Sequence, residues 1–205
     1  MSFVIFDTEY TTWKGCNENG WHGFQKKEIV QIAAIKINSD LEVTTDFNRL
    51  CKPQINPVLS DYFVNLTHIT NEDVAQNGIL FADAYAAFKK FVGADVCFSH
   101  GWGGNFNDKS DGDIIKENLQ LYGLPKDNDI TYRNIAPIFK QLYDKHHINI
   151  MRQSSGEIVH LLGIESAVKN LNIHNALFDV YSILEGLKYF KQDKDFILEH
   201  TRAAM

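Results

Sequence analysis

The segment Phe3-Val4-Ile5-Phe6-Asp7-Thr8-Glu9-Tyr10 is the starting point for interpreting this chain. Four consecutive apolar residues predict a buried β-strand, and two acids follow at once. Asp7 and Glu9 are two residues apart, so their side chains leave an extended backbone on the same face. Carboxylates held side by side repel each other unless a divalent cation lies between them. The segment is therefore either half of a metal site or a strand that ends in a solvated polar turn. Further acids elsewhere in the chain that could complete a metal site would favour the first interpretation.

The composition is that of an ordinary globular protein, with 44% hydrophobic and 22% charged residues. A length of 205 residues suits a single domain, spanning residues 1–205, with a sizeable core. We expect no secretory signal and no membrane span, because no long apolar run is present. The cysteines Cys16, Cys51 and Cys97 form no CxxC pair. This pattern favours a reducing, cytoplasmic location, and it argues against a zinc site.

The net charge of −6 argues against a general polyanion-binding surface, so local basic clusters must carry any nucleic-acid argument. One cluster, Lys14, Lys26 and Lys27, follows the first strand. The second comprises Arg133, Lys140, Lys145, His146, His147 and Arg152. Either cluster is a candidate phosphate track, although Lys140 and Lys145 equally fit solvated charges on a helix face.

The pattern along the chain predicts three early strands, at residues 3–6, 28–37 and 41–50, that form an antiparallel meander. Shorter strands are predicted at 96–99 and 130–132. The helices predicted from periodicity and capping lie at 61–66, from 70 onward, and at 81–92, 114–122, 135–143, 164–171, 176–190 and 196–200. Early strands followed by mixed helices and strands indicate one α/β or α+β domain.

Asp113 is the first candidate to complete the acid pair. It begins a helical stripe after a Gly-rich loop, where an acid can ligate a metal from a helix N-terminus. The alternative is simple capping, because Asp is favoured in a first helical turn. Asp111 is an equally good cap.

The segment from His174 to Asp179 is the second candidate. On one continuous helix the two residues would point roughly 140° apart and would not share a face. They act together only if His174 lies on the loop that enters the helix and Asp179 projects from its second turn. Asn172 and Asn175 allow such a break. The alternative is a polar loop histidine near a solvated acid.

Taken together, these residues occur in a known order: Asp-x-Glu on a strand, Asp at a later helix start, and His-x-x-x-x-Asp near the C-terminus. The order resembles that of the DEDDh group of 3′–5′ exonucleases, the DnaQ-like members of the RNase H-like fold. The YxxxD variant is excluded because Asn175 stands where its tyrosine would be. Segments 57–61 and 66–70 resemble the family's "LSD…LTGIT" region and, with Tyr10-Thr11-Thr12-Trp13, point to the Eri-like and histone-mRNA exonuclease branch. His68 departs from the glycine that is usual there.

The resemblance implies an α/β, RNase H-like fold with a mixed five-stranded sheet flanked by helices. It also implies a metal-dependent exonuclease that hydrolyses the terminal phosphodiester at a single-stranded 3′ end and releases nucleoside 5′-monophosphates. Two Mg²⁺ or Mn²⁺ ions, roughly 4 Å apart, would be held by Asp7, Glu9, Asp113 and Asp179. His174 would be the general base.

Substrate contacts are implied for Tyr10, Thr11, Leu66 and Ile69, because the family holds the terminal nucleotide with the corresponding segments. For Leu66 and Ile69 the alternative is ordinary core packing. The Eri-like character favours RNA over DNA, a choice that depends on contact with the terminal 2′-hydroxyl. Three other hypotheses stay open: a DNA exonuclease, an enzyme specific for very short oligoribonucleotides, and a non-catalytic nucleic-acid-binding module on the same fold.

Overall fold

The fold is described from a computed structural model, for residues 2–101, 110–150, 153–169 and 175–202. Its centre is a five-stranded sheet within those residues, in the order β3-β2-β1-β4-β5. The strands are β1 (Ser2–Tyr10), β2 (Ile29–Asn38), β3 (Val43–Leu50), β4 (Cys97–Ser99) and β5 (Tyr132–Asn134). β3, β2 and β1 pair antiparallel, whereas β4 and β5 run parallel to β1. The expected mixed five-stranded sheet is confirmed, although β5 begins two residues later than predicted.

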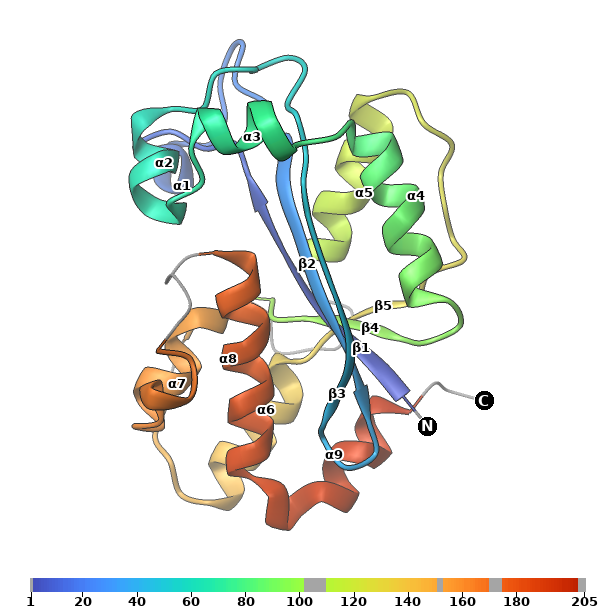
Figure 1. Cartoon of the computed structure of the whole chain (residues 1–205). Helices are drawn as coiled ribbons and strands as arrows, with labels where there is room; N and C mark the ends of the chain where they lie inside the picture. Colours follow the sequence, from blue (N-terminus) through green and yellow to red (C-terminus); the bar gives the residue numbers. More distant parts are fainter. Residues whose placement is uncertain (1, 102–109, 151–152, 170–174, 203–205) are drawn as a thin grey trace.

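Helices cover both faces of the sheet (Figure 1). The α-helices are α1 (Cys16–Asn19), α2 (Asp61–Thr67), α3 (Asn71–Asn77), α4 (Phe81–Val92), α5 (Asp111–Leu121), α6 (Ala136–Lys145), α7 (Ile158–Leu161), α8 (Ala176–Tyr189) and α9 (Lys194–Thr201). Three 3₁₀ turns are described, η1 (Ser155–Glu157), η2 (Glu165–Ala167) and η3 (Lys191–Asp193). No described helix is long and apolar enough to cross a bilayer.

The side chains of β1 alternate between two cores, as the period of a strand requires. Phe3 and Ile5 pack with α6, α8 and α9, whereas Val4 and Phe6 pack with α4 and α5. Because both faces are covered, β2 is almost continuously apolar and fully buried over residues 29–35. Asp7 and Glu9 continue the face that α8 covers, at the point where the apolar side chains of β1 end.

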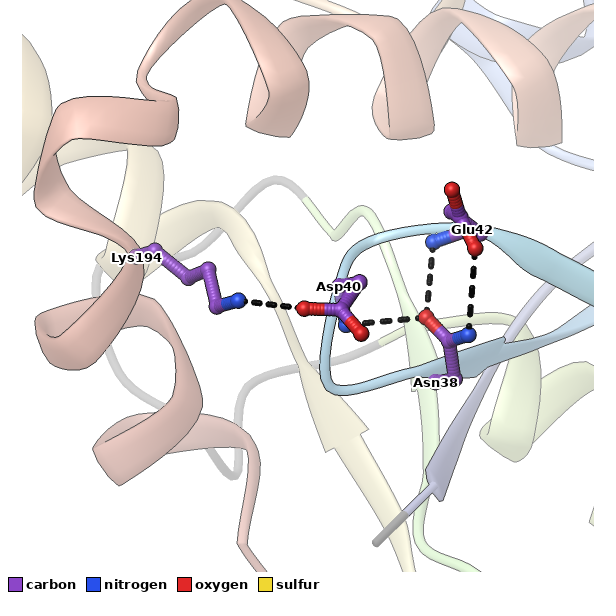
Figure 2. Close-up of polar contacts among 4 residues, drawn as sticks. All are labelled: Asn38, Asp40, Glu42 and Lys194. Carbon is purple, nitrogen blue, oxygen red and sulfur yellow. Dashed lines mark hydrogen bonds and ion pairs between the residues drawn. The ribbon is translucent and has the colours of Figure 1, made fainter.

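The β2–β3 hairpin is closed by the side chain of Asn38, whose Oδ1 accepts the backbone N–H groups of Asp40 and Glu42 at 2.8 and 3.0 Å (Figure 2). Asp40 in turn pairs with Lys194 of α9 at 2.6 Å. This contact ties the tip of the hairpin to the C-terminal helix, so an early and a late segment of the chain stabilise the same end of the sheet.

Three local predictions differ from the structure. α1 lies within residues 13–27, where no helix was predicted, and η1 and α7 lie between the helices predicted at 135–143 and 164–171. The helix predicted at 164–171 is wrong over the described residues 164–169, which contain only η2. The apolar residues that suggested this helix, Ile164 and Val168, instead pack with Val159 and Phe178 on α7 and α8. A small apolar cluster therefore mimicked helical periodicity.

Candidate active site

The candidate site lies where the end of β1 meets the first turns of α8 and α5. Asp7 is opposite Ala33 and Glu9 is opposite Gln31 in the β1–β2 register. Asp7 is buried and Glu9 is half-buried. Asp7, Glu9 and Asp179 each place one carboxylate oxygen within 4.8 Å of the others. The structure thus brings Asp179, which is distant in sequence, to the predicted pair of Asp7 and Glu9.

Asp179 is held in a defined orientation. Asn175 caps α8 by accepting the N–H of Leu177, so the helix begins at Ala176 and Asp179 lies in its first turn, not in the second turn as expected. The hydroxyl of Ser155 donates to Oδ2 of Asp179 at 2.9 Å. The other oxygen, Oδ1, is buried and has no hydrogen-bond partner within the described part of the chain. A buried carboxylate oxygen without a donor is an open ligand position.

Gly156 leaves the space that Asp179 needs. A Cβ atom at residue 156 would lie 2.6 Å from Oδ1 of Asp179. No side chain fits there without displacing that oxygen. Ser155 and Gly156 were not recognised from the sequence, and only their position beside α8 gives them this role.

The fourth acid is Asp111, and the assignment of Asp113 is wrong. Oδ1 of Asp111 accepts the backbone N–H and the hydroxyl of Thr8, at 3.2 and 2.6 Å. β4 pairs with β1 only at Val4 and Ile5, which leaves this edge of β1 open for a carboxylate from α5. Asp113 is turned about 200° around the helix, where it pairs with Lys116 at 3.3 Å.

A signal for Asp111 was present in the sequence. Asp111, Ile115 and Leu119 recur at a spacing of four, so they share one helix face, and the latter two are buried in the core. Asp113 falls out of phase with that stripe. Gly112 between the two acids allows close packing, because a Cβ there would lie 2.6 Å from the ring of Tyr132.

Burial raises the pKa values of all four acids. Burial is the largest cause for Asp7 and Glu9, whose pKa values lie well above the ordinary range, and the neighbouring acids add to it. Burial likewise raises the pKa of Asp111 to about 6 and that of Asp179 to about 7. None of the four forms an ion pair with a described basic residue. Such a cluster is stable in its charged form only with a bound cation.

The residues fit a hard divalent cation. The ligand atoms are all carboxylate oxygens, which Mg²⁺ and Mn²⁺ prefer over the nitrogen and sulfur ligands typical of zinc. The unpartnered Oδ1 of Asp179 and the convergence of three carboxylates within 4.8 Å support this fit independently of each other.

The remaining predicted site residues have mixed outcomes. His174 lies outside the described residues. Thr11 is buried, donates to the carbonyl of Lys26 at 2.5 Å and accepts the N–H of Glu28, so it joins the ends of a loop and has no exposed surface for substrate. Ile69 is buried in a small core beside α2, which corrects its assignment as a substrate contact. Leu66 and Tyr10 are half-buried and remain accessible.

Comparison with known proteins extends this picture. The family described as Exonuclease (RNase_T) matches residues 4–187. A curated relative, ERI1 exoribonuclease 2 of Xenopus laevis, is 36% identical over 90 residues, which cover 43% of this chain and 12% of the relative. The matched segment is thus a small part of that protein's length.

Solved structures share the fold. The nuclease domain of 3′hExo, a DEDDh family member bound to rAMP, superposes with a TM-score of 0.71 and 20% identity, covering 94% of this chain and 92% of that one. E. coli Exonuclease I in complex with a dT13 oligonucleotide gives a TM-score of 0.70 at 18% identity, over 97% of this chain and 43% of that one. With the acids on β1, α5 and α8, and with the family match over most of its length, the chain belongs to the RNase_T exonuclease family.

Proposed function

We propose that this protein is a metal-dependent 3′–5′ exonuclease that hydrolyses the terminal phosphodiester of single-stranded nucleic acid and releases nucleoside 5′-monophosphates. The observation that carries the proposal is the cluster of buried and half-buried acids Asp7, Glu9, Asp111 and Asp179, which has no basic residue to neutralise it among the described residues. A cluster that is unstable without cations, in a chain of an exonuclease family, is best explained as a catalytic metal site.

Each residue has a role in this proposal. Asp7, Glu9, Asp111 and Asp179 would hold two Mg²⁺ or Mn²⁺ ions. Bound there, such ions lower the pKa of a coordinated water and stabilise charge on the leaving 3′ oxygen. His174 would take the proton of the attacking water, since the ordinary pKa of histidine lies near neutrality. Its place in the sequence supports this role, because it directly precedes Asn175, the N-cap of α8.

RNA is the favoured substrate. The Xenopus relative is named an exoribonuclease, and the 3′hExo nuclease domain was determined with rAMP. DNA is the alternative substrate, because the structurally similar Exonuclease I was determined in complex with a dT13 oligonucleotide. A cytoplasmic location is proposed on the ground that Cys16, Cys51 and Cys97 are all free and buried, as a reducing compartment permits.

The test is incubation of the purified protein with 5′-labelled single-stranded RNA and the matching DNA, with Mg²⁺, Mn²⁺ or EDTA. A ladder that shortens from the 3′ end is expected with either metal, and EDTA or the Asp7→Ala substitution should abolish it. Asp83→Ala removes an exposed acid on α4 and is the matched control. The strand that is degraded faster identifies the substrate class.

Other outcomes distinguish the alternative hypotheses. Cleavage of dinucleotides to pentanucleotides but not of longer strands would indicate an enzyme for short oligoribonucleotides. Binding of labelled strands without cleavage under any metal would indicate a non-catalytic binding module. Cleavage that persists in Asp7→Ala would contradict the assignment of the site.

A further inference from the structure

The loop between β1 and β2 presents an unusual surface next to the candidate site. We propose that Trp13, Trp21, Phe24, Lys26 and Lys27, here called the loop ledge, bind the part of a single-stranded nucleic acid that lies upstream of its 3′-terminal nucleotide. This inference rests on the proposed function, because it extends the substrate site from the cleaved end to the body of the strand.

The loop ledge holds aromatic rings and cations in alternation. The ammonium of Lys27 lies 4.4 Å from the ring centre of Trp21 and 5.6 Å from that of Tyr10. Trp13 meets Phe24 edge-on at 6.0 Å, and 70% of the Phe24 side chain is exposed. Interleaved aromatic and basic side chains are typical of sites that bind single strands, where bases stack and phosphates pair with cations.

Hydrogen bonds from other parts of the chain hold the backbone of the loop ledge in place, so the positions of its side chains are fixed. Asn56 donates to the carbonyl of Phe24 at 3.1 Å and accepts the N–H of Lys26 at 3.0 Å. Asn118 of α5 donates to the carbonyl of Lys27 at 2.9 Å. The indole N–H of Trp21 donates to the carbonyl of Thr11 at 2.9 Å, which fixes the plane of that ring.

The charges of the loop ledge are left without acidic partners. Lys26 and Lys27 of the loop ledge, and Lys14 of the same loop, form no ion pair with any described residue, and Glu18 is the single acid that accompanies them between residues 13 and 27. Seven lysines elsewhere pair with carboxylates: Lys36, Lys89, Lys116, Lys140, Lys145, Lys188 and Lys194. Five other described lysines also lack an ion pair with a described residue but are scattered along the chain: Lys52, Lys90, Lys126, Lys169 and Lys191. In a chain of net charge −6, three unpaired lysines within one loop point to an anionic ligand.

The second basic cluster of the sequence does not compete for this role. Lys140 pairs with Asp144, while Lys145 and His146 both pair with Asp193. Arg152 lies outside the described residues. Three of the five described members are thus already neutralised, whereas Arg133 and His147 form no ion pair with a described residue. The loop ledge, whose lysines all lack such a partner, is the better phosphate track.

The loop ledge begins directly at the carboxylate cluster. Tyr10 follows Glu9 in β1, and its ring centre lies 5.9 Å from that of Trp21. Figure 1 shows α1, inside this loop, at the end of the sheet toward which the N-terminal end of α8 points. A strand whose 3′ end reaches Asp7 and Glu9 can therefore continue over this loop.

The test compares kcat/KM on oligonucleotides of 2 to 12 nucleotides, of whichever strand the protein degrades. Phe24→Ala and Lys26→Ala alter exposed side chains and are expected to leave the Tm unchanged. Each should lower kcat/KM on the 12-mer at least about 5-fold, with a clearly smaller loss on the dinucleotide. For Lys26→Ala, the slope of log kcat/KM against log salt on the 12-mer should become shallower by about 0.7. Controls are Lys90→Ala and Tyr189→Ala, which alter exposed residues on α4 and α8 away from this loop.

An equal loss of kcat/KM on both lengths, or no loss on either, would overturn the proposal and assign the exposed phenylalanine to another contact, such as a protein partner.

A binding measurement separates this proposal from the proposed catalytic function. Fluorescence anisotropy with a labelled 12-mer, in EDTA and with Asp7→Asn protein, should show weaker binding when Phe24→Ala or Lys26→Ala is added. If the 12-mer binds in this way but is never cleaved, the proposed function fails and the loop ledge stands. If no 12-mer binds, the loop ledge fails.

Discussion

Asp111 and Asp113 lie two residues apart on α5 and therefore point to different sides of the helix. The carboxylate of Asp111 lies beside Thr8, whereas that of Asp113 lies beside Lys116. Asp111→Ala is expected to lower kcat at least about 100-fold, because loss of a metal ligand should cost no less than loss of an outer partner. Asp113→Ala is the matched control and should retain near wild-type activity. Steady-state nuclease kinetics measure both, and the reverse ranking would restore Asp113 as the ligand.

Ser155 orients Asp179 through one hydrogen bond, so its hydroxyl sets which oxygen would face a bound metal ion. Ser155→Ala should weaken Mn²⁺ binding about 10- to 100-fold, as loss of such outer partners does. Isothermal titration calorimetry gives the affinity directly. Ser154→Ala tests the neighbouring serine, which caps η1 through Glu157. Ser154→Ala should lower the free energy of unfolding by about 1 kcal/mol and leave the Mn²⁺ affinity unchanged. Equal Mn²⁺ affinities in the two variants would refute the role of Ser155.

His68 ends α2 with a positive φ of 60°, a conformation that glycine adopts at little cost. The family's usual glycine at this position therefore has a backbone reason. His68→Gly is expected to raise the free energy of unfolding by up to about 1 kcal/mol. Chemical denaturation measures the change. Asn65→Gly, inside the same helix, should have the opposite sign, and destabilisation by both would contradict this explanation.

At the scale of elements, Gln31 joins β2, β3 and the start of α8. Its Nε2 donates to Asn48 and Asn175, both at 3.0 Å, and its Oε1 accepts the N–H of Ala176 at 3.0 Å. The Gln31 side chain is buried, so water cannot take over its hydrogen bonds to these three residues if it is removed. The sheet thereby fixes the N-terminus of the helix that carries Asp179.

Gln31→Ala should destabilise the protein by about 1–3 kcal/mol, because it leaves buried polar groups unpaired. It should also loosen the first turn of α8, which hydrogen exchange at residues 176–178 would detect as lower protection. Gln76→Ala removes an exposed glutamine on α3 and should change neither quantity. Unchanged exchange in Gln31→Ala would show that helix packing alone holds this end.

At the scale of the whole molecule, the raised pKa values make the metal-free protein sensitive to pH. The folded cluster binds protons more tightly than the unfolded chain, so stability is greatest below the unfolded pKa of about 4. It falls as pH rises through about 6 and 7, the values at Asp111 and Asp179. In EDTA, Tm should drop by roughly 5–10 °C between pH 4.5 and 8. Mn²⁺ should restore it at pH 8.

Asp179→Asn is the control for this effect, because it removes one of the titrating acids and should flatten the profile. Asp193 acts in the opposite direction. Hydrogen bonds from Lys145 and His146 lower its pKa, so it stabilises the protein above about pH 4 and loses this contribution only in stronger acid. A metal-free Tm that rises steadily toward pH 8 would contradict the electrostatic account of the cluster.

Much of the fold was accessible from sequence because its signals are local. β2 is apolar on both faces and the β2–β3 turn carries Asn38 and Asp40, so strand and turn were predictable. The pairing of Asp7 with Glu9 followed from the period of a strand. α7 was missed because four residues give no periodicity, and β5 was misplaced because three residues pair only through β4.

The sequence by itself determined the order of elements, the Asp-x-Glu pair on β1 and the start of α8 before Asp179, since each depends on backbone periodicity or capping within a few residues. The tertiary structure decided which acid of α5 enters the site, why residue 156 is glycine, and that Thr11 and Ile69 are structural. These points depend on rotation and contact between elements distant in the chain. A choice between two faces of a helix is an energy difference that only packing against the sheet supplies.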